Sequence, residues 1–326
     1  MKGCNAVVRM LTVGVLMAMA GPVAAQQAYP NKPIRLVSPF PPAGSTDILA
    51  RLVGQKLTES WGQPVLIENH PGANGVIGTD IVAKSSPDGH TILLVNSSHI
   101  INALLVTKLP FDPVKDFAPV ATLTISQFLM AINPSVPANT LREFIALAKS
   151  RPGQLNFASS GNGAVSHLAG ELFDLMTGVK MQHIPYKGAA PALTDLVGGQ
   201  VQVYFATTVS TMPYVKSGKV KALGISGDTR LSILPELPTF SEAGLPDFDV
   251  KNWFGIMAPA GTPKTTIGKL STEIARIMAL PDIKEKLASQ GLDPLISTPE
   301  QFAALMKAEM ARYAKVIKTA NIKLEN

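Results

Sequence analysis

Apolar positions along the chain follow two spacings that alternate from one end to the other. Apolar residues three and four apart predict amphipathic helices, as at Ile48, Leu49, Leu52, Val53 and Leu57. Short joints rich in proline and glycine separate the elements. The runs typical of strands lie at residues 34–37, 65–68, 91–95, 128–132, 181–184, 201–205, 220–225 and 253–258. This alternation predicts an α/β fold with mostly parallel sheets and flanking helices.

Two proline-rich stretches interrupt this alternation. Residues 109–119 and residues 234–249 each contain three prolines and show little periodicity. We interpret them as ordered connections that carry the chain from one lobe to another and back. The expected organisation is a leader at residues 1–25, a first lobe made of residues 26–127 plus 251–326, and a second lobe at residues 128–250.

The leader has the composition of a cleavable signal peptide. Lys2 and Arg9 flank an apolar stretch from Met10 to Ala20, and small residues follow, which predicts a cut after Ala25 and an exported mature chain. The one cysteine lies within the leader, so the mature protein has no disulfide. The formal net charge of +6 falls to +4 without Lys2 and Arg9. The remaining basic residues are scattered, so we expect no nucleic-acid partner.

The turn at residues 38–47, Ser-Pro-Phe-Pro-Pro-Ala-Gly-Ser-Thr-Asp, joins the first predicted strand to the first predicted helix. Ser45, Thr46 and Asp47 favour a helix start, where the first backbone amides have no partner within the helix. These amides and the helix dipole can receive a carboxylate or a phosphate without a charged side chain. Asp47 and Arg51 lie four residues apart and most simply form an ion pair.

Similar small, polar turns follow other strands. Residues 159–166 repeat the design of the first turn, and polar side chains including Ser97 follow the strand that ends at Val95. Ser and Asn in such turns can equally well cap a helix, and Gly can simply permit a positive φ. Tyr186 is as consistent with the edge of a domain as with a ligand contact. Lys187 is more simply explained as a solvated lysine than as a clamp for an anion.

Sequence signals for enzymatic chemistry are weak. The nearest approach to a nucleophile elbow, Gly163-Ala164-Val165-Ser166-His167, has the wrong spacing, and the five histidines include no H-x-x-x-H pair. Gly161-Asn162-Gly163 lacks the third glycine of a dinucleotide loop. We therefore expect no enzyme activity, no metal and no cofactor. The alternative is a periplasmic enzyme that acts on an organic acid through Ser166 or His99.

Seven motifs in order along the mature chain resemble the Bug family of periplasmic solute receptors, the TctC-type binding proteins of tripartite tricarboxylate transporters. They are Tyr29-Pro30-Asn31-Lys32-Pro33-Ile34-Arg35-Leu36, Pro39-Phe40-Pro41-Pro42-Ala43-Gly44-Ser45-Thr46-Asp47, Glu68-Asn69-His70-Pro71-Gly72-Ala73, Pro87-Asp88-Gly89-His90-Thr91, His183-Ile184-Pro185-Tyr186-Lys187-Gly188, Leu234-Pro235-Glu236-Leu237-Pro238-Thr239 and Ala258-Pro259-Ala260-Gly261-Thr262-Pro263.

The resemblance implies a two-lobed, type II periplasmic binding protein that closes like a Venus flytrap on the carboxylate of a small organic acid. It implies a periplasmic location and a partner among integral-membrane transporter subunits, or alternatively a sensor protein. We expect a monomer. The candidate ligand-binding residues are Phe40, Ala43, Gly44, Ser45, Thr46, Asp47, Ser97, Ser160, Asn162, Gly163, Tyr186, Ala206 and Thr207.

Two positions depart from the family pattern. Ala43 replaces the first glycine of a usual pair, which we expect to be tolerated only if its φ is negative. Ala206 stands where many relatives have Asp, so a ligand ammonium would lose a partner, and we expect a ligand without an amino group.

Overall fold

The computed structural model describes residues 29–227, 229–319 and 322. The chain divides into two units, Met1–Asn31 and Lys32–Asn326, and every helix and strand named below belongs to the second. The expected signal peptide lies outside the described residues. Within the described part, no helix has the length and apolar character needed to cross a membrane.

The first part of the fold is a β/α unit with parallel strands. Its central strand pairs with its two neighbours in parallel, in the order β2-β1-β3. All of β3 except its last residue is buried, as expected for a strand covered on both faces. Its elements are β1 (Ile34–Ser38), α2 (Ser45–Trp61), β2 (Val65–Asn69), η1 (Ala73–Gly75), α3 (Val76–Ala83), β3 (Thr91–Asn96) and α4 (Ser98–Leu105).

The second part repeats this arrangement. Its parallel strands have the order β6-β5-β7, so that again the first strand of the unit lies in the middle. Its elements are α5 (Leu141–Ser150), β5 (Asn156–Ser159), α6 (Val165–Thr177), β6 (Gln182–Pro185), α7 (Ala189–Val197), β7 (Val203–Thr207), α8 (Thr208–Lys216) and β8 (Lys221–Ile225). The last part holds β9 (Lys251–Pro259), α9 (Lys264–Met278), α10 (Pro281–Ala288), β10 (Leu292–Pro294) and α11 (Pro299–Thr319).

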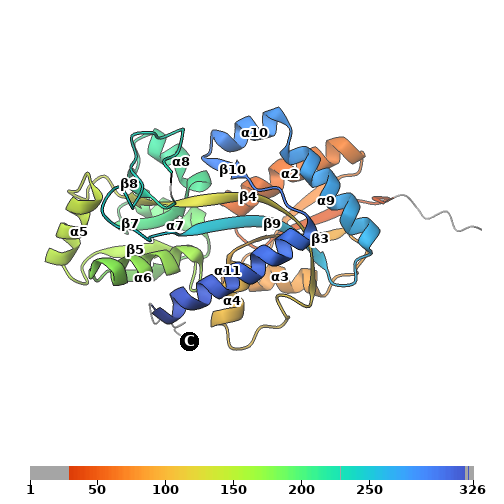
Figure 1. The fold of residues 1–326 in the computed structure, drawn as a ribbon, viewed down its shortest axis with the longest axis horizontal. Helices are drawn as coiled ribbons and strands as arrows, with labels where there is room; N and C mark the ends of the chain where they lie inside the picture. Colours follow the sequence, from red (N-terminus) through yellow and green to blue (C-terminus); the bar gives the residue numbers. More distant parts are fainter. Residues whose placement is uncertain (1–28, 228, 320–321, 323–326) are drawn as a thin grey trace, which may run out of the picture. The chain divides into compact units, whose positions relative to one another are not determined.

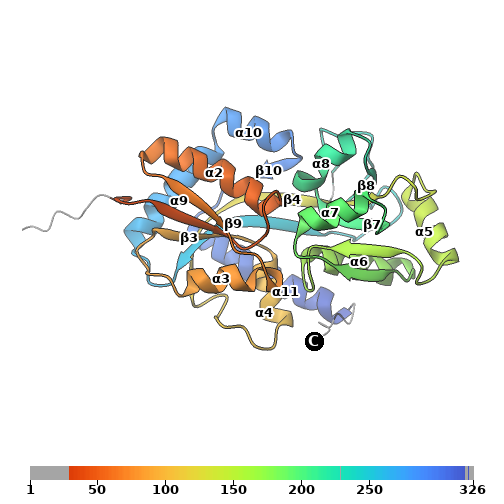
Figure 2. The ribbon, with the colours of Figure 1, turned by 180° about the vertical axis from the view of Figure 1, so that it is seen from behind.

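Two long strands join the parts. β4 (Phe117–Ile132) and β9 run antiparallel beside each other through the middle of the molecule, with α2, α3 and α9 at one end and α5, α6, α7 and α8 at the other (Figures 1 and 2). β4 pairs with β9 from Phe117 to Gln127 and with β7 from Phe128 onward. In the first half, β9 lies between β3 and β4. In the second half, β4 lies between β7 and β8.

These long strands change one detail of the expected fold, because the sheet is mixed rather than mostly parallel. Four strand pairings are parallel, those of β1 with β2 and β3 and of β5 with β6 and β7. Every pairing that involves β4 or β9 is antiparallel. The proline-rich stretch was also expected to stay irregular through Pro119, yet β4 includes this residue. The register shifts between Pro119 and Ala121, and a proline is tolerated in a strand at such a bulge.

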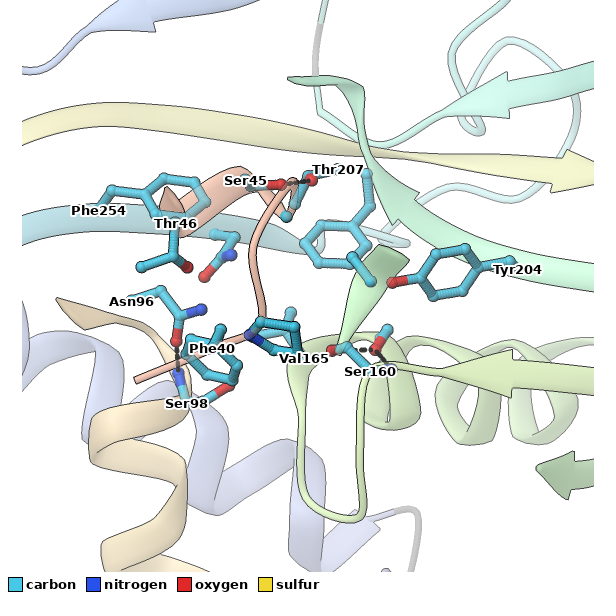
Figure 3. A pocket seen from close by; sticks show the side chains of 16 residues that line it. Phe40, Ser45, Thr46, Asn96, Ser98, Ser160, Val165, Tyr204, Thr207 and Phe254 are labelled. Atoms are coloured by element: carbon cyan, nitrogen blue, oxygen red, sulfur yellow. Dashed lines mark hydrogen bonds between the residues drawn. The ribbon is translucent and has the colours of Figure 1, made fainter. Parts of the chain in front are cut away.

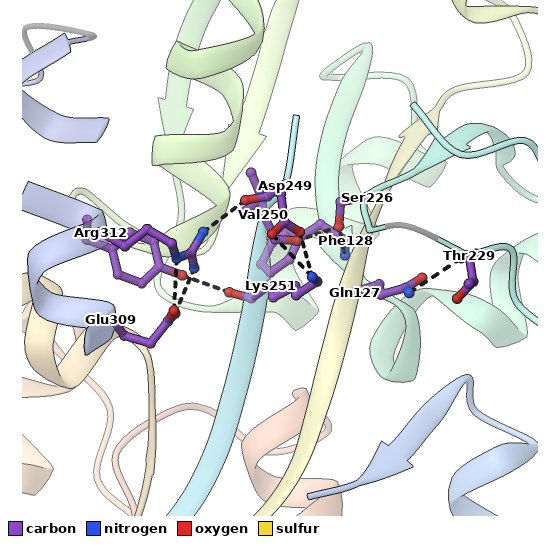
Figure 4. A network of polar contacts seen from close by, with 10 residues as sticks. Gln127, Phe128, Ser226, Thr229, Asp249, Val250, Lys251, Glu309 and Arg312 are labelled. Carbon is purple, nitrogen blue, oxygen red and sulfur yellow. Dashed lines mark hydrogen bonds and ion pairs between the residues drawn. The ribbon is translucent and has the colours of Figure 1, made fainter. Parts of the chain in front are cut away.

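A polar network surrounds the point where β4 changes partners and β9 begins (Figure 4). Phe128 N donates to Ser226 Oγ at 2.8 Å, and Ser226 Oγ donates to the carbonyl oxygen of Val250. From α11, Arg312 donates to the carbonyl oxygen of Asp249 at 2.9 Å. The Tyr313 hydroxyl donates to the carbonyl oxygen of Lys251 at 2.7 Å. Two side chains of the last helix thus hold the main chain at the start of β9.

The main apolar cluster continues across both halves of the sheet. It contains Val37 and Leu93 from the first half, Phe157 and Phe205 from the second, and Phe302 from the last helix. Trp253 is 1% exposed and packs edge-to-face on Phe302. A second cluster lies within the second half, on the side covered by α7.

Local capping signals in the sequence correspond to observed helix starts. Thr140 accepts from Glu143 N at the start of α5. At α11, Thr298 N donates to Gln301 Oε1 while Gln301 N donates to Thr298 Oγ1, which is the reciprocal capping box. Both helices begin directly after their capping threonines, α5 at Leu141 and α11 at Pro299. No pattern in the sequence indicated α10 and β10, which follow α9 directly.

Candidate functional site

The candidate site is a cavity of about 40 Å³ between the two halves of the sheet (Figure 3). Figure 3 shows Phe40, Thr46 and Asn96 on one side and Ser160 and Tyr204 on the other, with the Tyr204 hydroxyl turned inward. No charged side chain lines this cavity among the described residues. Its lining residues are Phe40, Pro41, Gly44, Ser45, Thr46, Asn96, Ser98, Phe128, Ser160, Val165, Ser166, Ala189, Tyr204, Thr207, Asn252 and Phe254.

Five helices present their N-terminal ends to this cavity: α4 opens at Ser98, whose amide donates to Asn96 Oδ1 at 2.9 Å, and the other four are α2, α6, α7 and α8. Ser45 and Thr46 open α2, Val165 and Ser166 open α6, Ala189 opens α7, and Thr207 precedes α8; all of these residues line the cavity. None of the four N-cap residues makes a side-chain capping bond. By contrast, the starts of α5 and α11, which do not line the cavity, are capped by threonine side chains. The cavity therefore faces backbone donors that the protein leaves without side-chain partners, and a helix N-terminus favours an anion.

The turn before α2 is held by Asp47. Its carboxylate accepts from Ala43 N at 2.9 Å, from Arg51 Nε at 3.0 Å and from Asn69 Nδ2 at 3.0 Å. Burial alone would raise the pKa of Asp47, but these hydrogen bonds and the charge of Arg51 outweigh burial and lower it. The Arg51 ion pair expected from the sequence is present. Asp47 is 3% exposed and does not line the cavity, so it shapes the turn rather than contacting its contents.

Ala43 has a φ of 62°, so the expectation of a negative φ is wrong. The hydrogen bond from Ala43 N to Asp47 Oδ2 holds the backbone in this conformation, and the next residue, Gly44, is the N-cap of α2. An L-residue in the left-handed region is strained by about 1 kcal/mol. The first turn therefore carries backbone strain at the edge of the candidate site.

The loop from Ser159 to Ser166 forms the opposite wall. Ser160 N donates to Ser166 Oγ at 2.9 Å, and the two serine hydroxyls share a hydrogen bond at 3.0 Å. Tyr204 lies beside both serines and is 2% exposed; burial raises its pKa well above the usual range, so its hydroxyl keeps its proton. This wall consists of hydroxyl groups that can donate to an anion.

Two stacked histidines, His167 and His183, contact this loop and support it. The rings of His167 and His183 lie 3.8 Å apart and nearly parallel. Gly163 N donates to His167 Nδ1 at 3.1 Å, and His183 Nε2 lies 2.6 Å from Ser159 Oγ. Burial, with a smaller contribution from His167, lowers the pKa of His183 to about 3, so His183 is neutral near pH 7. Both histidine rings thus support the loop backbone.

The two walls touch each other directly. Ser45 Oγ and Thr207 Oγ1, which come from opposite halves, lie 2.6 Å apart and share a hydrogen bond (Figure 3). A Cβ added at Gly188 would lie 2.6 Å from Pro41 Cδ, so the two halves also approach closely at this glycine. These contacts describe a closed cleft.

A second cavity, of about 460 Å³, adjoins the first and shares Phe40, Pro41 and Ser160 with it. Its other lining residues include Asn162, Tyr186, Lys108 and Lys187. Tyr186 donates its hydroxyl to Asp195 Oδ2 at 2.7 Å. Burial first, and then Asp195, raise the pKa of Tyr186 to about 12.

The candidate residues from the sequence divide into three groups. Phe40, Gly44, Ser45, Thr46, Ser160 and Thr207 line the first cavity. Asn162 and Tyr186 line the second, together with Phe40 and Ser160. The residues that line neither are Ala43, Asp47, Ser97, Gly163 and Ala206.

Ser97 and Ala206 are occupied elsewhere. Ser97 is fully buried, donates its amide to Asn252 Oδ1 at 3.1 Å and accepts from Trp253 N at 3.2 Å. Its neighbours Asn96 and Ser98 line the cavity instead. Ala206 belongs to the apolar cluster of the second half. In β7, Ala206 lies on the same face as Tyr204, but its short side chain lines neither cavity.

Several cavity residues were not among the candidates. Tyr204, Asn252 and Phe254 lie in predicted strands or next to them, and only the pairing of β4, β7 and β9 brings them together. A polar residue inside an apolar strand, such as Tyr204 or Asn252, is the signal that could have indicated them. Val165 and Ser166 belong to the 159–166 turn that we compared with the first turn, but neither was named as a candidate, and Phe128 was considered only as part of a strand.

The two residues considered for catalysis, Ser166 and His99, do not pair with each other, and Ser159, which contacts His183, is fully buried and lines neither cavity. Ser166 Oγ is bonded to Ser160, while His99 Nε2 donates to the carbonyl oxygen of Pro113 at 2.8 Å. Burial lowers the pKa of His99 to about 4, and its ring packs against Phe111 and Phe117. Among the described residues, no three His, Cys, Asp or Glu side chains are grouped so as to hold a metal ion.

Comparison with known proteins relates this chain to a family of receptors. The profile of the tripartite tricarboxylate transporter family receptor, TctC, matches residues 49–322. Protein BugT of Bordetella pertussis is 38% identical over 318 residues, which cover 96% of this chain and 97% of BugT.

Two solved structures extend the comparison. R. palustris Rpa4515 with adipate has a TM-score of 0.89 and 35% identity, covering 90% of this chain and 99% of that chain. The periplasmic binding protein BugD has a TM-score of 0.87 and 33% identity, covering 91% of this chain and all of that chain. The two-lobed α/β fold expected from the sequence is thereby confirmed. The chain belongs to the TctC family of tripartite tricarboxylate transporter receptors, which includes the Bug proteins.

Proposed function

We propose that this chain captures a small organic carboxylate between its two lobes and delivers it to the membrane subunits of a tripartite transporter. One observation carries the proposal: four uncapped helix starts surround a cavity with no charged side chain. Such a site selects a small anion through fixed backbone dipoles and binds it reversibly. Adipate, which is present in the structure of the related Rpa4515, is also a small organic carboxylate.

We place the lobe boundaries at residues 127/128 and 250/251. The first lobe is then residues 26–127 plus 251–326, and the second is residues 128–250. The change of strand partner between Gln127 and Phe128 supports the first boundary, and the start of β9 at Lys251 supports the second. Closure of these lobes, through contacts such as Ser45 with Thr207, is the state that a transporter would recognise.

The proposed ligand has no amino group. Neither cavity is lined by an Asp or Glu side chain among the described residues. A ligand ammonium buried here would have no carboxylate partner, and an unpaired buried charge is costly. This argument rests on the cavity walls rather than on residue 206.

We also propose that the chain acts in the periplasm as a monomer and without enzymatic activity. The composition of residues 1–25 supports export with cleavage after Ala25. The bonded state of Ser166 and His99 supports binding without chemistry.

Native mass spectrometry of the protein purified from the periplasm tests the function. The expected result is a co-purified organic acid, released unchanged on denaturation, that also raises the melting temperature of the ligand-free protein. A panel of carboxylic acids should reproduce the shift, whereas amino acids should not. Absence of any stabilising acid, or recovery of a chemically altered ligand, would contradict the proposal.

A further inference from the structure

The two adjoining cavities differ greatly in volume. The inner cavity, between the helix starts, measures about 40 Å³, and the outer one measures about 460 Å³. Since a cavity needs about 10–15 Å³ to hold one water molecule, the inner cavity holds about three water-sized atoms. That is the size of one carboxylate group. The rest of a longer acid must pass Phe40, Pro41 and Ser160, which line both cavities, into the outer one.

The outer cavity also differs from the inner one in charge. Lys108, which follows α4, and Lys187, which lies between β6 and α7, both line it, and no Asp or Glu does among the described residues. Within the described chain, neither lysine forms an ion pair. The lysines belong to opposite lobes, so closure brings two uncompensated positive charges to one chamber.

One wall of the outer cavity has a fixed and strained backbone. Gly72, Ala73, Asn74 and Gly75 have φ values of 137°, 46°, 51° and 89°, four positive values in succession. Asn102, which is 4% exposed, holds this turn: Asn74 Nδ2 donates to Asn102 Oδ1 at 2.9 Å, and Asn102 Nδ2 donates to the Asn74 carbonyl at 3.0 Å. Strained turns that neighbouring groups maintain in this way are concentrated at binding sites.

We infer that the outer cavity receives the second, negatively charged end of an extended dicarboxylate, with Lys108 and Lys187 as the residues that select it. The inner cavity holds one carboxylate on the helix amides, and the carbon chain crosses the passage at Ser160. This inference rests on the proposed function and specifies its ligand class. A shorter acid, whose second carboxylate cannot reach beyond the passage, gains nothing from the lysines.

Calorimetric titration with matched acids tests this inference. Linear dicarboxylates of four to eight carbons are each compared with the monocarboxylate of equal carbon number, in the wild-type protein and in the Lys108→Ala/Lys187→Ala double variant. Each exposed ion pair of this kind changes the affinity by a small factor. The longer dicarboxylates should therefore bind the wild type about 2- to 20-fold more tightly than the monocarboxylates of equal carbon number. The double variant should lose this ratio and keep its monocarboxylate affinity. Added salt should reduce the ratio in the wild type.

The Lys219→Ala variant is the matched control, because Lys219 is an exposed lysine of the second lobe that lines neither cavity. It should behave as the wild type. Equal binding of the mono- and dicarboxylates at every length, or a ratio that survives in the double variant, would overturn the inference and leave the proposed function intact. Failure of every acid to bind the wild type would instead refute the proposed function.

Discussion

A single methyl group at Gly188 should weaken closure of the cleft. A Cβ at this position would lie 2.6 Å from Pro41 Cδ and 2.8 Å from Pro41 Cγ, across the two lobes. Carbon atoms prefer separations of about 3.5–4.0 Å, so the walls would have to move apart by about 1 Å. Overpacking of this kind costs about 1–3 kcal/mol, which corresponds to a Kd about 5- to 150-fold higher in Gly188→Ala.

A double-mutant cycle separates this clash from other effects. Pro41→Ala removes Cγ and Cδ and leaves Cβ, which is 3.7 Å from the added methyl group, an ordinary contact. The Gly188→Ala/Pro41→Ala variant should therefore recover most of the affinity that Gly188→Ala loses, giving a coupling free energy of about 1–3 kcal/mol. Calorimetry with the acid that gives the largest thermal shift measures each Kd.

A second glycine supplies the control for backbone strain. Gly188 has a φ of 129°, so alanine there also strains the second lobe. Gly199 has a φ of 77°, but its nearest neighbour, Asn133 Nδ2, would lie 3.7 Å from an added Cβ. Gly199→Ala should lower the melting temperature and leave the Kd unchanged. Wild-type affinity in Gly188→Ala, or no recovery with Pro41→Ala, would refute the closed-cleft geometry.

Three further predictions concern the walls and the fold. Ala43→Gly should relieve the left-handed strain and, after the entropy lost by glycine, raise the free energy of unfolding by about 0.5–1 kcal/mol in urea titrations; a lower stability would contradict the strain at φ 62°. Burial, aided by Glu171, raises the pKa of Asp174 to about 7, so its contribution to stability is full below pH 4 and lost as the pH rises toward 7. Asp174→Asn should therefore gain stability relative to the wild type between pH 5 and pH 8, and a pH-independent difference would exclude this. Tyr204→Phe removes a buried hydroxyl from the cavity and should raise the Kd about 2- to 12-fold in calorimetry with little change in melting temperature; an unchanged Kd would mean that the hydroxyl does not contact the ligand.

The local part of the site could be predicted from the sequence because helix starts and turns depend on neighbouring residues. The turn from Phe40 to Thr46 and the loop at Ser160 were identified from small polar residues between a strand and a helix, and both line the cavity. The capping box at Thr298 was likewise visible in the sequence. These signals depend on contacts within three or four residues.

The remaining cavity residues depend on strand pairing, which the sequence does not state. Asn252 and Phe254 enter the cavity because β9 crosses the molecule beside β4, and Tyr204 enters because β7 pairs with the far half of β4. The difference between Ser97 and Ser98 is one residue, yet one contacts β9 and the other the cavity. The direction of the side chain reverses with each residue along a strand. A sequence pattern locates the end of a strand only to within about two residues, so it does not determine which side chains face the cavity.

The positive φ of Ala43 could not be predicted from its residue type, since alanine ordinarily avoids this region. It follows from the carboxylate of Asp47, which accepts from Ala43 N and is itself held by Arg51 and Asn69. Asn69 ends β2, so the conformation depends on a strand that lies elsewhere in the sequence.

The most direct test of the central claim is an NMR titration of the ¹⁵N-labelled protein with the acid found by mass spectrometry. If helix amides hold the carboxylate, the largest shifts should occur at the amides that open α2, α6, α7 and α8, including those of Ser45 and Ser166. The amides that open the capped helices α5 and α11 should move little. Tight binding of the acid with no shift at the first four helix starts would contradict the account.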